Sequence, residues 1–238
     1  MGDRDEASDD GVQAISALGE PSRRALYDAV AKADDWVSRD QAADATGMER
    51  GTAAHHLDRL AAEGLLEIDF KRLTGRSGPG AGRPAKMYRR ADRDFDVSLP
   101  PRDYRLAGRL LARAVDRSRS EDLDVTEALA EEAAKEGRRW AEAIRSRLRD
   151  ATSRRASTRR DAIVGALETQ GFEPALDDDG VVVLRNCPFD YLAAEHTDLI
   201  CNMNVCLIDA TITGVGRSGV TARLDPVEGQ CCVKLVPK

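Results

Sequence analysis

The chain is poor in aromatic side chains, and it has no cysteine in the first three quarters of its length. Aromatic residues make up 4% of the 238 positions, whereas Ala, Leu and Val are abundant, a balance that favours packed helices over a sandwich of sheets. No apolar run approaches the roughly 18 residues of a membrane span, and the acidic first ten residues precede no apolar stretch. We therefore expect no membrane span and no signal peptide, and we predict a cytoplasmic protein.

Positive charge is in the minority, since 36 Lys and Arg stand against 42 Asp and Glu and the formal net charge is −6. This balance excludes a chain that is basic throughout. The cations are nevertheless unevenly distributed, because residues 71–90 carry seven Lys or Arg and no acidic residue. The sequence thus predicts a local basic surface, which is what neutralisation of nucleic-acid phosphates requires.

Apolar periodicity and helix-breaking residues divide the chain into three regions. We predict a winged helix-turn-helix DNA-binding domain at residues 11–92 and a helical linker and dimerisation region at 101–157. Residues 158–238 mix helix and strand patterns and are predicted to form an α+β sensor domain that contains the cysteines. The expected fold class is therefore mainly α with a smaller α+β part.

The first region has the order of a helix-turn-helix followed by a hairpin. Ser22 is the predicted N-cap of the second helix, and a third helix begins after Ser38 and ends at Gly47. A fourth helix covers 49–63, and strand patterns flank a segment rich in Gly and Pro at 74–84, which neither a helix nor a central strand tolerates. A helix pair followed by a hairpin with a long tip is the winged-helix order.

The outward side of the fourth helix and the hairpin carry donors for phosphates and base edges. Such a polar helix face is also common as plain solvated surface, and a basic Gly-rich loop is also compatible with disorder. The helix pair is followed by a basic hairpin, which is the order that DNA binding by a winged helix-turn-helix requires. The combination therefore favours DNA binding. The candidate DNA-contacting residues are Arg50, Thr52, His55, His56, Arg59, Arg76, Arg83 and Lys86.

The segment from Thr52 to Leu60 (TAAHHLDRL), followed by Gly64-Leu65-Leu66, resembles the recognition helix of ArsR-like winged-helix transcription regulators. The resemblance covers about residues 11 to 90. It implies a transcription regulator that binds double-stranded DNA and is not an enzyme. We expect a homodimer on a two-fold symmetric operator, because a symmetric dimer reads two half-sites.

All five cysteines lie between Cys187 and Cys232. In a reducing cytosol disulfides are not expected, which leaves metal or cluster ligation, redox chemistry or buried inert thiols. Cys187 follows a predicted strand, Cys201 begins a predicted helix, and Cys231 begins the predicted final strand. These three ends are able to meet at one point. On a regular final strand Cys231 is the preferred ligand, whereas an irregular strand start makes Cys232 the alternative; Cys206 is predicted to be a core thiol. No CxxC pair of the zinc-ribbon type is present, and the remaining candidate for a fourth ligand is His196.

Three motifs of this region are Asn186-Cys187-Pro188-Phe189, Cys201-Asn202-Met203-Asn204 and Asp225 to Val233 (DPVEGQCCV). They resemble the C-terminal part of the iron-sulfur cluster assembly regulators, the Suf repressors, and of their actinobacterial relatives. The resemblance implies an iron-sulfur cluster on Cys187, Cys201 and Cys231 that controls operator affinity. Alternatives that stay open are a zinc or small-molecule sensor behind the same DNA-binding domain, a site that binds nothing, and a thiol redox protein.

Overall fold

A computed structural model of the chain describes residues 3–71, 84–149, 156–227 and 229–238. It divides into two compact units, residues 1–97 and 98–238. The structure is mainly helical, with a small sheet beside the N-terminal helices and an α+β region that contains the cysteines, and this confirms the predicted fold class.

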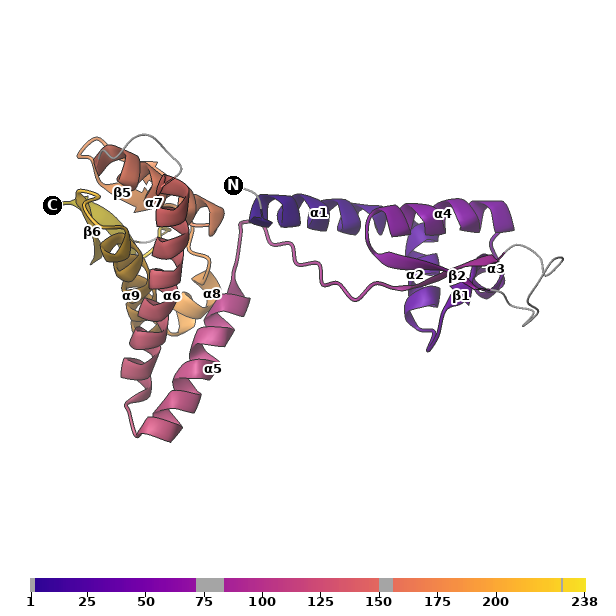
Figure 1. Ribbon diagram of the computed structural model, residues 1–238, viewed down its shortest axis with the longest axis horizontal. Helices are drawn as coiled ribbons and strands as arrows, with labels where there is room; N and C mark the ends of the chain where they lie inside the picture. The colour runs from indigo at the N-terminus through magenta and orange to yellow at the C-terminus, as the bar shows by residue number, and fades with distance from the viewer. Residues whose placement is uncertain (1–2, 72–83, 150–155, 228) are drawn as a thin grey trace. The chain divides into compact units, whose positions relative to one another are not determined.

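Within the described residues of the first unit, four helices and a three-stranded antiparallel sheet form a winged helix-turn-helix-like arrangement (Figure 1). The short first strand pairs with the third, which pairs in turn along its whole length with the second. The elements are α1 (Asp3–Ala17), α2 (Pro21–Ala31), β1 (Val37–Ser38), α3 (Arg39–Thr46), α4 (Arg50–Ala62), β2 (Leu66–Lys71) and β3 (Ala85–Arg90).

Local sequence signals set most helix ends in this unit. Ser38 caps α3 in a capping box with Gln41, and Gly47 ends that helix in the left-handed conformation at φ +66°, as predicted. The N-cap prediction for α2 was wrong. Glu20 caps this helix, because its carboxylate accepts from the backbone N–H groups of Ser22 at 3.0 Å and Arg23 at 2.7 Å.

The described residues of the second unit form five helices and a four-stranded antiparallel sheet. The strands lie in the order β4 (Pro174–Leu176), β5 (Val182–Leu184), β7 (Val233–Pro237) and β6 (Val220–Leu224). The structure adds a short strand, β4, that the sequence patterns did not indicate, and it starts the last strand at Val233 instead of Cys231. The elements are α5 (Tyr104–Glu121), α6 (Val125–Arg149), α7 (Ala156–Thr169), β4 (Pro174–Leu176), β5 (Val182–Leu184), α8 (Asp190–Glu195), α9 (Thr197–Val215), β6 (Val220–Leu224) and β7 (Val233–Pro237).

One hydrophobic core runs through this whole unit. Leu110 of α5 and Leu129 of α6 are buried together with Phe172, Leu207 and Leu235 from the cysteine-containing part. The structure therefore groups residues 101–149 with the region that follows, whereas the sequence patterns placed a boundary near residue 157. The reason is physical: the apolar stripe of α6 packs against α9, and that of α5 packs against α6.

Helices α6 and α9 cross at unusually small residues. A Cβ atom at Gly137 would collide with the backbone carbonyl of Leu207, and one at Gly214 would stand 2.6 Å from the Cβ of Ala141. Thr211 adds a hydrogen bond from its hydroxyl to the Gly137 carbonyl oxygen at 3.2 Å. Glycine at residue 137 therefore permits the backbone approach on which this helix pair depends.

Helix α9 is, within the described part of the chain, the one helix whose length and composition would suffice to cross a membrane. Half of the apolar stretch of this helix is buried inside the unit. Ile200, Leu207, Ile208 and Ile212 belong to the shared core, as expected for the central helix of a packed domain.

Candidate functional site

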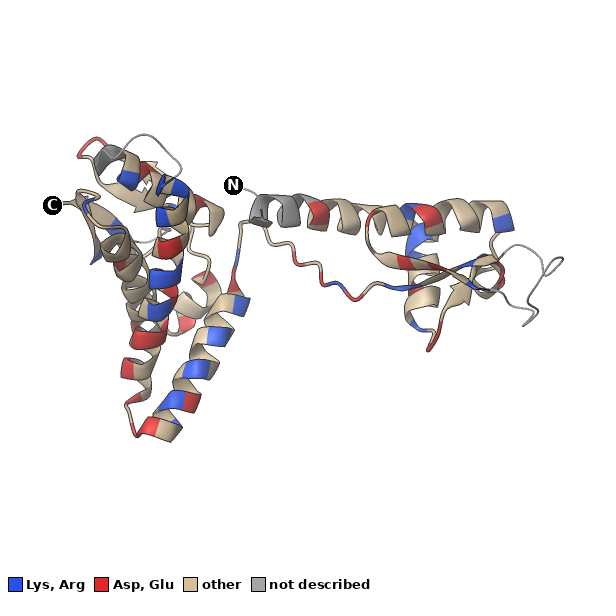
Figure 2. Ribbon diagram, viewed as in Figure 1, with Lys and Arg blue, Asp and Glu red and all other residues tan. Residues whose placement is uncertain are grey.

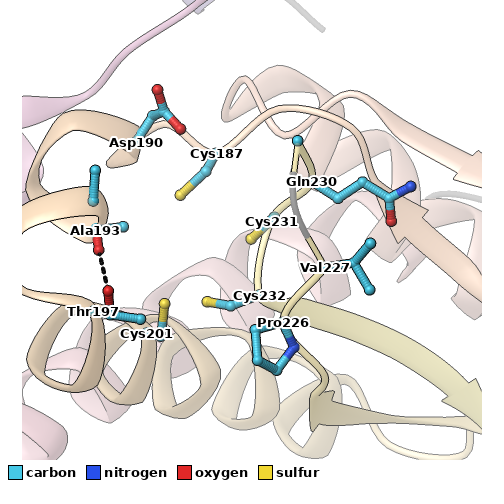
Figure 3. Close-up of a pocket in the computed structure, with 12 residues that line it drawn as sticks. Cys187, Asp190, Ala193, Thr197, Cys201, Pro226, Val227, Gln230, Cys231 and Cys232 are labelled. Carbon is cyan, nitrogen blue, oxygen red and sulfur yellow. Dashed lines mark hydrogen bonds between the residues drawn. The ribbon is translucent and has the colours of Figure 1, made fainter.

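Four of the five cysteines line one pocket of about 480 Å³ in the second unit. Cys187 lies in the loop after β5, Cys201 in the first turns of α9, and Cys231 and Cys232 in the segment before β7. Figure 3 shows their sulfur atoms directed toward a common space. The structure thus brings together all four cysteines that the sequence proposed as ligands. The other lining residues are Asp190, Ala193, Ala194, Thr197, Pro226, Val227, Gly229 and Gln230.

The two adjacent cysteines both reach the pocket because the chain is irregular where they lie. The regular-strand prediction for Cys231 was wrong, since β7 begins only at Val233. Instead, the Cys231 N–H donates to the Leu184 carbonyl at 2.9 Å, and the Cys232 carbonyl accepts from the N–H of Asp225 at 2.7 Å. These bonds hold a non-repeating backbone in which neighbouring side chains need not point to opposite faces. Cys231 and Cys232 are therefore both available as ligands.

The environment of Cys187, Cys201 and Cys231 favours the protonated form of these three thiols. A hydrogen bond with Cys231, together with burial, raises the pKa of Cys187, and burial raises the pKa of Cys201. The pKa of Cys231 is raised to about 12: the hydrogen bond with Cys187 lowers it, but the hydrogen bond with Cys232 and burial raise it more. Protonated, buried thiols are poor nucleophiles, whereas a bound soft cation displaces their protons.

Among the described residues, no group of three or more His, Cys, Asp or Glu side chains is arranged so that it could hold a metal ion. The donor set nevertheless suits a thiophilic metal or cluster, because four sulfurs from three chain segments face one cavity. His196 is exposed at the residue before α9 and is not part of the pocket lining. Cys206 is half-buried against the core, away from the lining residues.

A hydrogen-bonded latch holds the Cys187 loop to the start of the second unit. Arg102 donates from Nη1 to the Asn186 side-chain oxygen and, at 3.0 Å, to the Cys187 carbonyl, and its Nη2 lies 3.3 Å from the Asp190 carboxylate. Asn186 Nδ2 donates to the carbonyls of Pro101 at 2.9 Å and Gly171 at 2.5 Å. The sequence patterns did not reveal this latch, because its members are about 85 residues apart in the chain.

In the first unit, the candidate DNA-contacting residues divide into exposed and buried groups. Arg50, Thr52, His55 and Arg59 lie exposed on α4. His56 differs, since its side chain is only 16% exposed, lies 3.9 Å from the Glu20 carboxylate and has a buried Nδ1 without a partner. It therefore belongs to the interior side of α4. Arg76 and Arg83 lie outside the described residues.

The exposed cations of this face are paired with acids. Arg50 contacts Asp40 at 2.5 Å, and Arg59 contacts Glu63 at 2.6 Å. Lys86 of β3 reaches across to Asp58 of α4 at 2.5 Å, so the structure places the hairpin strand against this helix. Figure 2 accordingly shows basic and acidic residues interleaved over the unit. A polyanion that binds here has to replace these carboxylates as partners of the cations.

Replacing Asp58 by Asn is expected to destabilise the first unit by about 1 kcal/mol at pH 7, the upper range for a half-exposed pair. Burial raises the pKa of Asp58, but the hydrogen bonds from Lys86 and Tyr88 lower it more, so the net pKa is lowered. A lowered carboxyl pKa gives stability that is complete above the unfolded pKa and disappears as the pH falls through the folded one.

Denaturant unfolding of wild type and Asp58→Asn between pH 3 and pH 7, followed by Trp36 fluorescence in a Trp140→Phe background, measures this difference. The difference should persist from pH 7 to about pH 4, near the ordinary carboxyl pKa, and should shrink as the pH falls below it toward the lowered pKa of folded Asp58. A difference that stays constant over the whole range would contradict the assignment to the Asp58 charge.

Comparison of the chain with protein-family models, curated proteins and solved structures finds no match in any of the three.

Proposed function

We propose that the protein is a sequence-specific transcription regulator, a repressor, whose affinity for double-stranded operator DNA is set by an iron-sulfur cluster. The observation that carries this proposal is the meeting of four thiols in one pocket on a chain that also has a winged helix-turn-helix-like unit. The proposed ligands are Cys187, Cys201 and Cys231, with Cys232 as the alternative to Cys231. The protein is proposed to act in the cytoplasm as a homodimer on a two-fold symmetric site.

The DNA-binding half of the proposal is supported by α4, because its exposed side carries hydrogen-bond donors of the kinds that read base edges and phosphates. Lys86 lies beside this helix and adds a phosphate contact once its partner Asp58 is displaced. Each phosphate that is neutralised releases counterions, so binding should weaken steeply as salt rises.

Selection of duplexes from a random pool, followed by binding titrations over a salt series, tests this half. Arg59→Ala removes a cation from the exposed side of α4, and Arg24→Ala removes one from α2 as a matched control. We expect Arg59→Ala to weaken operator binding about 5-fold or more, an ordinary loss for one direct contact, and Arg24→Ala to have little effect. Equal losses in both variants would show that net charge, and not this helix, determines binding.

The sensing half rests on the protein's own residues. When bound, the cluster supplies a group whose charge changes with its oxidation state. Cys187, Cys201 and Cys231 would hold it in the pocket lined by α8 and the segment before β7, and Arg102 connects the Cys187 loop to the residues before α5. Movement of that loop is therefore transmitted to the residues at which the first unit joins the second.

Replacing Arg102 by Ala is expected to leave the cluster bound but to uncouple it from operator affinity. Couplings between sites are commonly about 5- to 150-fold in affinity, and we expect the ratio between loaded and empty protein to fall to about 3-fold or less in this variant. Arg109→Ala, at an exposed position on α5 seven residues further along the chain, is the control and should keep the full ratio. A full ratio in Arg102→Ala would exclude the latch as the route.

A zinc-dependent regulator is the second candidate. The observation that favours it is that the pocket contains four thiols, the number that a structural zinc site takes. Iron, zinc and acid-labile sulfide analysis of anaerobically purified protein, together with its visible spectrum, separates the two. A thiol redox protein is disfavoured, because the raised pKa values of Cys187, Cys201 and Cys231 oppose the thiolate that exchange chemistry needs.

A further inference from the structure

Asn204 is a buried amide directly behind the cysteine pocket. Its side chain is 1% exposed, and its Nδ2 donates a hydrogen bond to the Cys231 sulfur at 3.2 Å. It lies one turn after Cys201 on α9, so one face of this helix presents both a pocket thiol and the amide. The amide oxygen Oδ1 is buried and has no partner.

A buried asparagine with an unpaired amide oxygen lowers the stability of the core if packing is its only role. Asn204 sits among Ile200, Met203, Leu207 and Ile208, where a leucine of similar shape would bury apolar surface and leave no polar atom unsatisfied. A buried amide with an unpaired oxygen therefore calls for a compensating role. The partner it does have is a sulfur, and a sulfur is a much better acceptor as a thiolate than as a thiol.

We infer that Asn204 is a positioning residue for Cys231, whose amide N–H orients the sulfur and stabilises it as a thiolate ligand of a soft metal centre. The inference rests on the proposed ligation by the pocket cysteines and holds for a cluster or for a single thiophilic cation. Partners of this kind around metal ligands change metal affinity by about 10- to 100-fold when they are removed.

The test is an anaerobic titration of the full-length apo protein with Co²⁺ alone, followed by the sulfur-to-cobalt charge-transfer absorption. Asn204→Leu removes the donor and keeps the side-chain shape. Asn202→Leu is the matched control, because Asn202 is exposed on the same helix and donates to the Asp198 carbonyl instead of a sulfur. We expect Co²⁺ to bind Asn204→Leu about 10-fold or more weaker than wild type, and Asn202→Leu to match wild type.

Thermal unfolding of the apo proteins separates this role from a structural one. Asn204→Leu should unfold at the same temperature as wild type or higher, since the unpaired oxygen is gone. A lower unfolding temperature would assign Asn204 to core structure and overturn the inference, as would unchanged Co²⁺ affinity in Asn204→Leu. Failure of wild type itself to bind Co²⁺ would overturn the proposed ligation as well, so the two failures are distinguishable.

Discussion

Replacing Cys187 by Ser is expected to abolish cluster binding. The Cys187 sulfur faces the other three thiols in the pocket, and a serine hydroxyl in its place is a hard, weakly coordinating ligand for iron-sulfur centres. After anaerobic reconstitution, wild type should show visible absorption and contain both iron and acid-labile sulfide, whereas Cys187→Ser should be colourless. The operator affinity of this variant should no longer respond to reconstitution.

Cys206→Ser is the control for this experiment. Cys206 also lies on α9 and is half-buried, yet it is not among the residues that line the pocket. This variant should keep wild-type absorption and iron content, because only a core thiol is changed. Loss of iron in both variants would point to general instability of the second unit, and a colourless reconstituted wild type would refute cluster sensing altogether.

Replacing Gly137 by Ala is expected to destabilise the second unit by about 3 kcal/mol, the upper end for overpacked sites. The added methyl group collides with the Leu207 carbonyl, which is backbone and cannot rotate away, and it also meets the Ala210 side chain. Helices α6 and α9 must therefore separate, although alanine by itself favours a helix by about 1 kcal/mol over glycine. Denaturant unfolding followed by Trp140 fluorescence in a Trp36→Phe background measures the effect on this unit.

Gly108→Ala provides the matched comparison. Gly108 lies exposed on α5, and an added Cβ there meets no atom within 4 Å. This variant should be more stable than wild type by about 0.5 to 1 kcal/mol, the helix-propensity gain. Equal behaviour of the two variants would mean that the α6–α9 crossing is not as close as the structure has it.

Elements set by neighbouring residues could be predicted from the sequence. The α3 cap at Ser38 and the left-handed end at Gly47 depend on interactions within a few residues, so both are visible in the sequence. Strand β4 was missed because Pro174–Leu176 is only three residues long and is defined by its pairing with β5. The inward orientation of His56 was missed because it depends on the packing of α4 against α2.

In the candidate site, too, some features were visible in the sequence and others depend on contacts between distant residues. The sequence indicated which cysteines to consider, because they are confined to one region and occur in three separate motifs. It did not show that Cys231 and Cys232 both reach the pocket, since this follows from the irregular backbone that Leu184 and Asp225 hold. Nor did it indicate Arg102 or Asn204, whose roles come from contacts with residues 85 and 27 positions away.

By itself, the sequence determined the mainly helical class and the order of helices and hairpin in the first unit, and it indicated which cysteines to consider as candidate ligands. Periodicity, caps and turn residues act over a few positions, so a linear chain records them directly. Only the tertiary structure decided that α5 and α6 share a core with the cysteine region and that four thiols line one pocket. It also decided that Arg102 contacts the Cys187 loop and that Asn204 contacts Cys231. Those features arise from the burial of apolar faces against distant partners, and burial is a property of the folded chain as a whole.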